Sequence, residues 1–460
     1  MGYSENAWEK YSEEEMKKVF ALSDDYKKFM SKCKTERECV KEIINIAEQN
    51  GYKDLDKVIA SNEKLNVGDK VYRVNKGKSV ALFIIGKKPI DEGMNILGAH
   101  IDSPRLDLKQ NPLYEDTDLA LLDTHYYGGI KKYQWVTLPL SIHGVVVKKD
   151  LTKVDIVIGE DENDPVVGVS DLLVHLAQTQ QEKKGNKVVE GEDLNILVGS
   201  IPLKGEKKNK VKANILKILK EKYDITEEDF VSAELEIVPA GKARDYGIDR
   251  SMVMCYGQDD RVCSYTSLMA FMEAKDLEKT AVCLLVDKEE IGSVGATGMK
   301  SRFFENTVAE LIDRIGNYSE LTLRRALTNS KMLSSDVSAA FDPNYPSVME
   351  KNNCAYFGKG IVFNKYTGSR GKSGSNDANP EFIAELRKIM DDNNVCYQTA
   401  ELGKVDQGGG GTIAYILAEY DMEVIDCGVA LHNMHAPYEI ASKADIYEAY
   451  KGYYAFLKNA

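Results

Sequence analysis

The sequence predicts an α/β fold in which a sheet carries helices on both faces and is interrupted by a β-rich insert. Apolar runs typical of buried strands alternate with helical patterns before residue 110 and after residue 250. Between about residues 110 and 245, strand-like segments follow one another without helices. The 460 residues also exceed what one hydrophobic core usually serves. We therefore expect a discontinuous domain, 1–109 and 246–460, and an inserted domain, 110–245.

The elements of the discontinuous domain follow from the period of their apolar residues. "SVALFIIG" (79–86) and "MNILGAH" (94–100) are continuous apolar runs, as expected for two strands of a buried sheet. "CVKEIINIAEQNGY" (39–52) has apolar residues at helical spacing. The second half repeats this alternation, with helices expected at 264–275, 305–315 and 381–393 and strands at 280–287, 395–402 and 422–429.

The insert is expected to be mostly strands. "QWVTLPLSIHGVVVKK" (134–149) and "KVDIVIG" (153–159) have strand character, with no helix between them. The Lys-rich stretch 204–225 is typical of a solvated loop that leads into an amphipathic helix.

Composition narrows the possible partners and the compartment. The formal net charge of −13 argues against nucleic acid or an anionic membrane as a partner, because both require a basic surface. There is no apolar stretch of 18 residues and no hydrophobic leader in the acidic N-terminal segment, so we expect a cytoplasmic protein. The eight cysteines include no C-x-x-C pair. Buried free thiols fit them best, so any metal should be bound by nitrogen and oxygen.

A histidine and a carboxylate close the second predicted strand. In "ILGAHIDSPRLDLK" the apolar run ends at His100, and Asp102 follows two residues later. On a strand these two side chains share one face, so Asp102 can hold one ring nitrogen while the other meets a metal. The alternative is a histidine and an aspartate that pair only with each other.

Two adjacent carboxylates follow a later strand. In "LLVDKEEIGSVGATG" an apolar run leads into Glu289 and Glu290 and then into a Gly-rich turn. Neighbouring carboxylates at a strand end repel each other unless a cation lies nearby, and open α/β sheets place their sites at such ends. A solvated acidic turn is the alternative.

Further candidate ligands follow other apolar runs. Asp259 and Asp260 in "YGQDDRVCS" would either cap the following helix or bind metal. Asp336 in "MLSSDVSAAF" and the pair His432 and His435 in "VIDCGVALHNMHAPYE" also end apolar segments. Two histidines and three carboxylates make the ligand set of a paired divalent site, suited to Zn²⁺, with Mn²⁺ or Co²⁺ possible.

The set "GAHIDSPRLDLK", "DDR", "DKEEIGS", "DVSAAFDPNY" and "MHAPYEIASK" resembles the M18 family of metallo-aminopeptidases, the aspartyl aminopeptidase family, in its bacterial type. The order and spacing match over the whole chain, insert included. The resemblance implies a zinc-exopeptidase-like fold with a mixed sheet, peptide substrates and two divalent ions per subunit. "DDR" departs from the "DN" of eukaryotic M18 enzymes toward the M42 aminopeptidases. A broad preference for neutral residues therefore stands beside the expected preference for N-terminal Asp or Glu.

Carried over residue by residue, the resemblance gives each motif a role. His100, Asp259 and Asp336 would bind one metal, and Asp259, Glu290 and His435 would bind the other. Glu289 would be the general base and acid, and Asp102 would orient His100. A metal-bound water would be the nucleophile. A cis peptide bond is expected after Asp259. Retention of Glu289 argues against a non-catalytic metal-bound scaffold.

The resemblance also implies self-association and substrate-binding residues. The insert would form a dimer contact, and dimers would build a twelve-subunit shell. His175, in "GVSDLLVHLAQ", would reach a neighbouring subunit's active site; a histidine on a helix face that packs at the dimer contact is the alternative. Lys365, in "VFNKYTGSRGKSGS", would meet a substrate carboxylate, with Arg370 and Lys372 as competitors and a solvated loop as the alternative.

Overall fold

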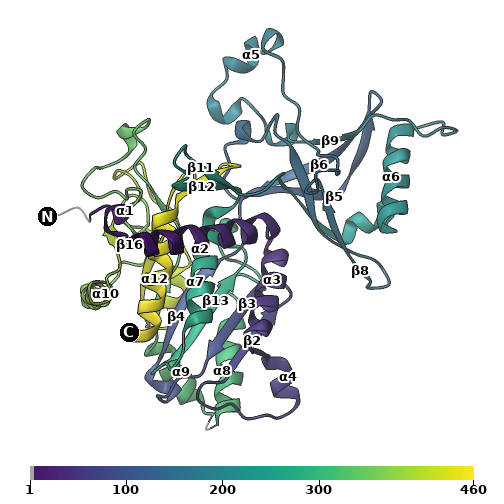
Figure 1. The fold of residues 1–460 in the computed structure, drawn as a ribbon. Helices are drawn as coiled ribbons and strands as arrows, with labels where there is room; N and C mark the ends of the chain where they lie inside the picture. Colours follow the sequence, from purple (N-terminus) through teal and green to yellow (C-terminus); the bar gives the residue numbers. More distant parts are fainter. Residues whose placement is uncertain (1–4, 317) are drawn as a thin grey trace. The chain divides into compact units, whose positions relative to one another are not determined.

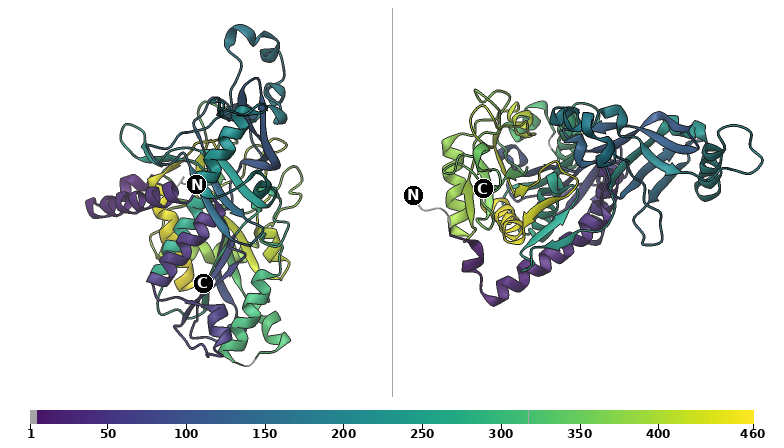
Figure 2. Two further views of the ribbon diagram at one scale, coloured as in Figure 1. Left: turned by 90° about the vertical axis from the view of Figure 1, so that its right-hand side faces the viewer. Right: turned by 90° about the horizontal axis from the view of Figure 1, so that it is seen from above.

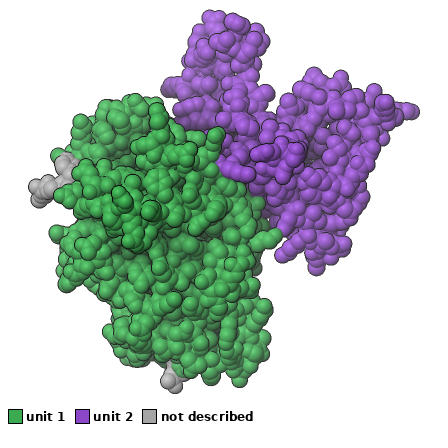
Figure 3. Space-filling view, in the orientation of Figure 1, with its two compact units in different colours: residues 1–102, 243–434, 439–460 green, residues 103–242, 435–438 purple. Residues whose placement is uncertain are grey.

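The computed structural model describes residues 5–316 and 318–460, which form two compact units (Figure 3). Unit 1 takes the chain up to Asp102, then Ala243–Met434 and Glu439–Ala460. Unit 2 takes Ser103–Lys242 and the short segment His435–Tyr438. The chain thus leaves unit 1 directly after the motif that contains His100 and Asp102.

Unit 1 is built on a nine-stranded mixed sheet (Figure 1). Its middle strand β4 (Met94–His100) lies between β13 (Thr280–Val286) and β14 (Lys331–Ser334) and runs parallel to both. The strand order is β1 (Lys53–Asp54), β2 (Lys70–Asn75), β3 (Ser79–Ile84), β13, β4, β14, β18 (Glu423–Gly428), β16 (Ile361–Asn364) and β17 (Tyr397–Thr399). β3 and β16 pair antiparallel with β13 and β18, which makes the sheet mixed, as predicted.

Helices cover both faces of this sheet (Figures 1 and 2). Along β13, Cys283 packs into one buried cluster and its neighbours Val282 and Leu284 into another, as the two-residue period of a strand requires. One cluster includes residues of α2 (Glu13–Lys32), α3 (Glu36–Gln49), α7 (Gln258–Glu273), α10 (Pro380–Asp392) and α12 (Lys443–Asn459). The other includes residues of α4 (Leu55–Ala60), α8 (Phe303–Ile315), α9 (Glu320–Thr328) and α11 (Ala414–Ala418).

Local capping fixes where the first long helices begin. α2 starts at a capping box in which Ser12 and Glu15 bond each other's backbone N–H, and α3 starts at a second one formed by Thr35 and Glu38. The short α1 (Ala7–Lys10) precedes them. The predicted helices at 39–52, 264–275, 305–315 and 381–393 are all present, with ends shifted by a few residues.

A second sheet of unit 1 was not foreseen from the sequence. It has five short strands in the order β11 (Arg244–Tyr246), β12 (Met252–Cys255), β20 (Glu439–Ser442), β19 (Ala430–His432) and β15 (Ser338–Ala339). The antiparallel pairing of β12 and β20 places Glu439 opposite Cys255, just before the "GQDDR" segment. This sheet therefore joins two of the candidate motifs.

Unit 2 contains a six-stranded antiparallel sheet. Its strand order is β8 (Lys153–Ile158), β7 (Leu140–Val147), β10 (Ala233–Pro239), β5 (Arg105–Asp116), β6 (Leu119–Tyr127) and β9 (Ile196–Gly199). The Lys-rich stretch forms a loop followed by helix α6 (Lys210–Tyr223), as predicted. Of the strand expected at 134–149, only β7 (Leu140–Val147) forms, and residues 134–139 form a turn and loop. A short helix, α5 (Gln178–Gln181), completes the unit.

All eight cysteines are buried and free, as expected. In the described part of the chain, no helix combines the length and the apolar composition that crossing a bilayer requires.

Candidate active site

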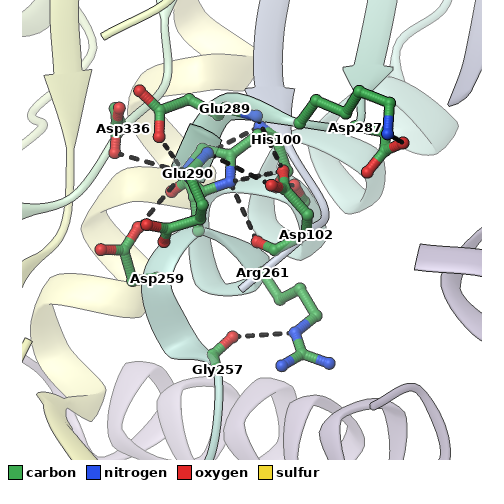
Figure 4. A network of polar contacts seen from close by, with 12 residues as sticks. His100, Asp102, Gly257, Asp259, Arg261, Asp287, Glu289, Glu290 and Asp336 are labelled. Carbon is green, nitrogen blue, oxygen red and sulfur yellow. Dashed lines mark hydrogen bonds and ion pairs between the residues drawn. The ribbon is translucent and has the colours of Figure 1, made fainter. Parts of the chain in front are cut away.

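The candidate site lies where three parallel strands of unit 1 end (Figure 4). His100 is the last residue of β4. Glu289 and Glu290 follow β13 on a single 3₁₀ turn, and Asp336 follows β14. Because parallel strands bring their carboxyl ends to one edge, residues far apart in sequence meet there.

The ring of His100 faces three of the predicted acidic residues. Its Nε2 atom lies 3.2 Å from Oδ1 of Asp259, and 3.8 Å from both Oε2 of Glu289 and Oδ1 of Asp336. The histidine is 1% exposed, and Nε2 has no hydrogen-bond partner among the described residues. A buried ring nitrogen that contacts carboxylates without a well-aligned hydrogen bond is costly, and a bound metal ion would remove that cost.

Asp102 connects the ends of β4 and β13. Nδ1 of His100 lies 3.0 Å from the carbonyl oxygen of Asp102 and 3.3 Å from its Oδ1. The two carboxylate oxygens of Asp102 also accept the backbone N–H groups of Glu289 and Glu290, each at 3.2 Å. With its proton on Nδ1 directed to Asp102, the imidazole presents the lone pair of Nε2 to a metal.

Asp259 and Asp260 lie at a kink near the start of α7. The N-cap of α7 is Gly257, which has no side-chain cap bond, and both aspartates have non-helical backbone angles. The peptide bond between them is cis, which confirms the expectation from the resemblance. Asp260 is fully buried and its Oδ2 accepts the backbone N–H of His100 at 3.3 Å.

The site has a large excess of negative charge. Burial raises the pKa of Glu289 to about 8; His100 opposes this shift, while Asp336 and other nearby carboxylates add to it. Burial likewise raises the pKa of Asp260 and of Asp336. For His100, burial lowers the pKa, but the surrounding carboxylates outweigh it and leave the pKa well above its usual value. A divalent cation would stabilise all these carboxylates in their charged form.

The donor atoms fit such a cation. One ligand atom each from His100, Asp260 and Asp336 lie within 4.8 Å of one another, and so do atoms of His100, Glu289 and Glu290. A carboxylate oxygen of Asp259 lies equally near one of Glu290. Imidazole nitrogen and carboxylate oxygen suit zinc, manganese and cobalt.

Comparison with known proteins identifies the family. The profile described as "Aminopeptidase I zinc metalloprotease (M18)" matches residues 29–457. A probable M18 family aminopeptidase 1 from Clostridium acetobutylicum is 72% identical over 455 residues, which cover 99% of this chain and 98% of the relative. The chain belongs to the M18 family. It is accordingly a metallo-aminopeptidase, a hydrolase that releases N-terminal residues from peptides.

Solved structures of M18 proteins have the same fold. The crystal structure of an M18 aminopeptidase from Thermotoga maritima superposes with a TM-score of 0.95 at 46% identity, and each chain is covered completely. The crystal structure of aminopeptidase I from C. acetobutylicum gives 0.94 at 70% identity, again over both complete chains. Membership in a zinc metallopeptidase family overturns the alternative of a non-catalytic scaffold.

Two of the predicted histidines lie outside unit 1. His435 belongs to the segment that groups with unit 2, where its Nδ1 lies 2.7 Å from the carbonyl oxygen of Gly129. His175 is exposed on a single 3₁₀ turn, Val174–Leu176, and not on a helix face. By contrast, His432 is a structural residue: its Nε2 lies 3.0 Å from the carbonyl oxygen of Phe341, and its ring packs on Phe357.

The predicted substrate-binding lysine is already in an ion pair. Lys365 and Lys372 both pair with the carboxylate of Asp377, and all three side chains are nearly half exposed. Lys372 also lies over the ring of Tyr366, 3.9 Å from its centre. A cavity of about 380 Å³ opens between residues 366–372 and 401–409, and Arg370 is among its lining residues.

The sequence patterns did not point to several buried charged residues that contact the segments of the M18 site. The sequence assigned Asp260 no role apart from Asp259, and it assigned none to Asp287, Arg261 or Glu439, although all three lie in the quoted motifs. Asp287 is fully buried one residue after β13 and lies 3.5 Å from Nζ of Lys78. The signal available in the sequence was a charged residue directly after an apolar run, as Asp287 is in "AVCLLVD".

Proposed function

We propose that this M18 aminopeptidase uses two divalent ions per subunit, held by His100, Asp259 and Asp336 on one side and by Asp259, Glu290 and His435 on the other. The observation that carries the proposal is the buried Nε2 atom of His100, which faces several carboxylates and no cation among the described residues. Asp260, the next residue in the sequence, is the alternative to Asp259 as a ligand beside His100 and Asp336.

In this mechanism Glu289 handles the proton. Bound divalent ions would polarise the scissile carbonyl and acidify the attacking water. Glu289 accepts the proton of that water and returns it to the leaving amine. Its backbone is fixed by Asp102, which also fixes the ring of His100. Because these side chains are largely shielded from solvent, water cannot take over the proton transfer, and the positions of Asp102 and Glu289 control it.

The metal count tests the ligand assignment. Wild-type protein reconstituted with zinc should contain two ions per subunit, and Glu290→Gln should retain one with full affinity and bind the other weakly. Inductively coupled plasma mass spectrometry after gel filtration gives the counts. A single ion in the wild type, or two tightly held ions in Glu290→Gln, would contradict the assignment.

Zinc is the expected metal, with manganese or cobalt as alternatives. The donor set of imidazole and carboxylate accommodates all three ions. Reconstitution of metal-free protein with each ion, followed by measurement of kcat/KM, should rank zinc first. Activity with manganese and none with zinc would identify manganese as the native metal instead.

We also propose a preference for N-terminal Asp or Glu, with Lys365 as the residue that meets the substrate carboxylate. The segment 365–377 contains three cationic residues and one carboxylate, so it keeps positive charge after internal pairing. Because Lys365 and Lys372 share Asp377, an incoming carboxylate would compete with that residue. Arg370, on the cavity wall, is the strongest competitor for the role.

Specificity is tested with peptides that begin with Asp, Glu, Leu or Ala. The wild type should show the highest kcat/KM for Asp or Glu, and Lys365→Ala should lose that preference while keeping its activity on Leu. A preference that survives in Lys365→Ala but disappears in Arg370→Ala would transfer the role to Arg370. A wild type that prefers Leu would establish the broad neutral aminopeptidase instead.

Assembly through unit 2 completes the proposal, together with a cytoplasmic location. Four large apolar residues within five positions, Leu172, Leu173, Val174 and Leu176, are each more than half exposed, with His175 among them. Such a patch is typical of an interaction surface. The mApe1 protein of S. cerevisiae, whose chain is 20% identical to this one, forms a dodecamer in its solved structure, and we propose the same assembly here, built from dimers.

Light scattering coupled to gel filtration tests the assembly. Wild-type protein should elute as a dodecamer, and Leu173→Asp should shift it to smaller species. His175→Ala should keep the assembly and lower kcat if His175 acts in a neighbouring site. A fully active wild-type monomer would contradict both the assembly and that role.

A further inference from the structure

The segment that carries Asp259 and Asp260 is anchored by a buried arginine (Figure 4). Arg261 is fully buried. Its Nε donates to the carbonyl oxygen of Gly257 at 2.9 Å, and its Nη1 donates to the carbonyl oxygen of Cys33 at 2.7 Å. The first bond spans Asp259 and Asp260, and the second fixes the segment to the end of α2. The guanidinium also lies over the ring of Tyr256.

This arrangement explains the glycine of the motif. Gly257 has a φ of +70°, which favours glycine. A Cβ atom built on it would lie 1.4 Å from Nη2 of Arg261, so any side chain at 257 would displace the guanidinium. The buried position of the Arg261 side chain therefore requires glycine at position 257.

A buried glutamate holds the same segment from the other side. Oε2 of Glu439 accepts the backbone N–H of Asp259 at 3.0 Å. The backbone carbonyl of Glu439 accepts Nε2 of Gln258 at 2.7 Å, and Oε1 of Gln258 accepts the hydroxyl of Tyr26. Glu439 lies four residues after His435, so it ties the backbone of Asp259 to the strand that follows this candidate ligand.

We propose that Arg261 and Glu439 are positioning residues that hold the Asp259–Asp260 segment in its metal-binding arrangement. This inference rests on the proposed function, in which Asp259 is a ligand of both ions. Neither residue touches the substrate in this mechanism. Without these anchors, mutual repulsion would move the clustered carboxylates apart before a metal binds. Groups that orient ligands typically change metal affinity by about 10- to 100-fold when substituted.

The geometry predicts that lysine cannot replace Arg261. The guanidinium reaches two carbonyl oxygens through two different nitrogens, whereas lysine has one nitrogen on a flexible stem. Arg261→Lys should therefore keep the buried charge and lose one anchor. Glu439→Gln should keep an oxygen acceptor for Asp259 but remove the charge that strengthens this bond.

The experiment compares four variants in the full-length protein: Arg261→Lys, Glu439→Gln, Asp259→Asn and the control Glu448→Gln. Glu448 is a matched control because it is also fully buried and its Oε2 also accepts a backbone N–H, from Cys396 at 2.6 Å. The measurements are the zinc dissociation constant by competition with a chromophoric chelator, the visible absorption spectrum of the Co²⁺ form, and the thermal unfolding midpoint.

Arg261→Lys and Glu439→Gln should weaken zinc binding by about 10- to 100-fold and alter the Co²⁺ spectrum. Glu448→Gln should lower the unfolding midpoint and leave affinity and spectrum within twofold of wild type. Wild-type affinity and spectrum in either positioning variant overturn the proposal for that residue, even if the variant is less stable. If Arg261→Lys does not fold, Glu439→Gln decides. Wild-type zinc affinity in Asp259→Asn would instead overturn the ligand assignment of the proposed function.

Discussion

Two parts of unit 1 have opposite charge imbalances. At the end of β4, one histidine faces several buried carboxylates, and burial raises the pKa of Glu289 to about 8. The segment 365–377 holds three cationic residues and one carboxylate, Asp377; Lys365 and Lys372 pair with it, and these three side chains are nearly half exposed. The first imbalance is expensive because water cannot compensate it, and the second is cheap because water can.

Of these two charge imbalances, the buried one is the stronger evidence for a functional site. A buried cluster of carboxylates is stabilised either by protonation or by bound cations, and membership in a zinc metallopeptidase family favours cations here. An exposed excess of lysine and arginine persists in any case, so it supports a substrate-binding role only together with the adjacent cavity. The metal site is therefore the better founded of the two assignments.

Glu289→Gln should produce the largest effect on the buried side of this comparison. The amide cannot accept the proton of the attacking water, so kcat should fall by about 10²- to 10⁴-fold. Both metals should remain bound, because Glu289 is proposed as a base and not as a ligand. Steady-state kinetics and the metal content of the same preparation test this. Near-wild-type turnover would exclude Glu289 as the base.

Lys78→Met should reveal how much a buried charge depends on its partner. Nζ of Lys78 lies 2.9 Å from Oε1 of the fully buried Glu36 and 3.5 Å from Oδ2 of Asp287. Removing this ammonium takes a cationic partner away from both buried carboxylates, so the free energy of unfolding should fall by about 3–5 kcal/mol. Nζ of Lys288, 3.7 Å from Oδ2 of Asp287, remains near one of them. Urea unfolding followed by circular dichroism measures it. An unchanged midpoint would mean that the buried carboxylates do not need this cation.

Removing the metals should destabilise the protein through the buried cluster. Ions that bind only the folded state stabilise it by about 2.7 kcal/mol when free metal exceeds the dissociation constant 100-fold. Chelation should therefore lower the unfolding midpoint and abolish activity, and zinc should restore both. Identical unfolding curves with and without metal would show that the carboxylate cluster does not bind ions.

Lys365→Ala should have the smallest effect on stability. The ion pair with Asp377 is nearly half exposed, and such pairs contribute about 0–1 kcal/mol. The urea midpoint should match that of wild type, in contrast to Lys78→Met. A loss comparable to that of Lys78→Met would mean that the segment 365–377 is held by this pair and would remove the distinction between the two regions.

The sequence alone determined the alternation of helices and strands, the strand-end positions of His100, Glu289 and Asp336, and the family. These features depend on local periodicity and on short motifs, which are written in consecutive residues. The burial of all eight cysteines followed from the same apolar patterns.

Only the tertiary structure decided what surrounds those residues. Glu439 accepts the backbone N–H of Asp259 from 180 residues away, and Arg261 bonds the carbonyl of Cys33 from 228 residues away. The second sheet of unit 1, the grouping of His435 with unit 2, and the pairing of Lys365 with Asp377 are likewise invisible in the pattern of residues. Periodicity tells each side chain which face of its own element it occupies. Which distant backbone group it meets depends on how the elements pack, and no local pattern encodes that.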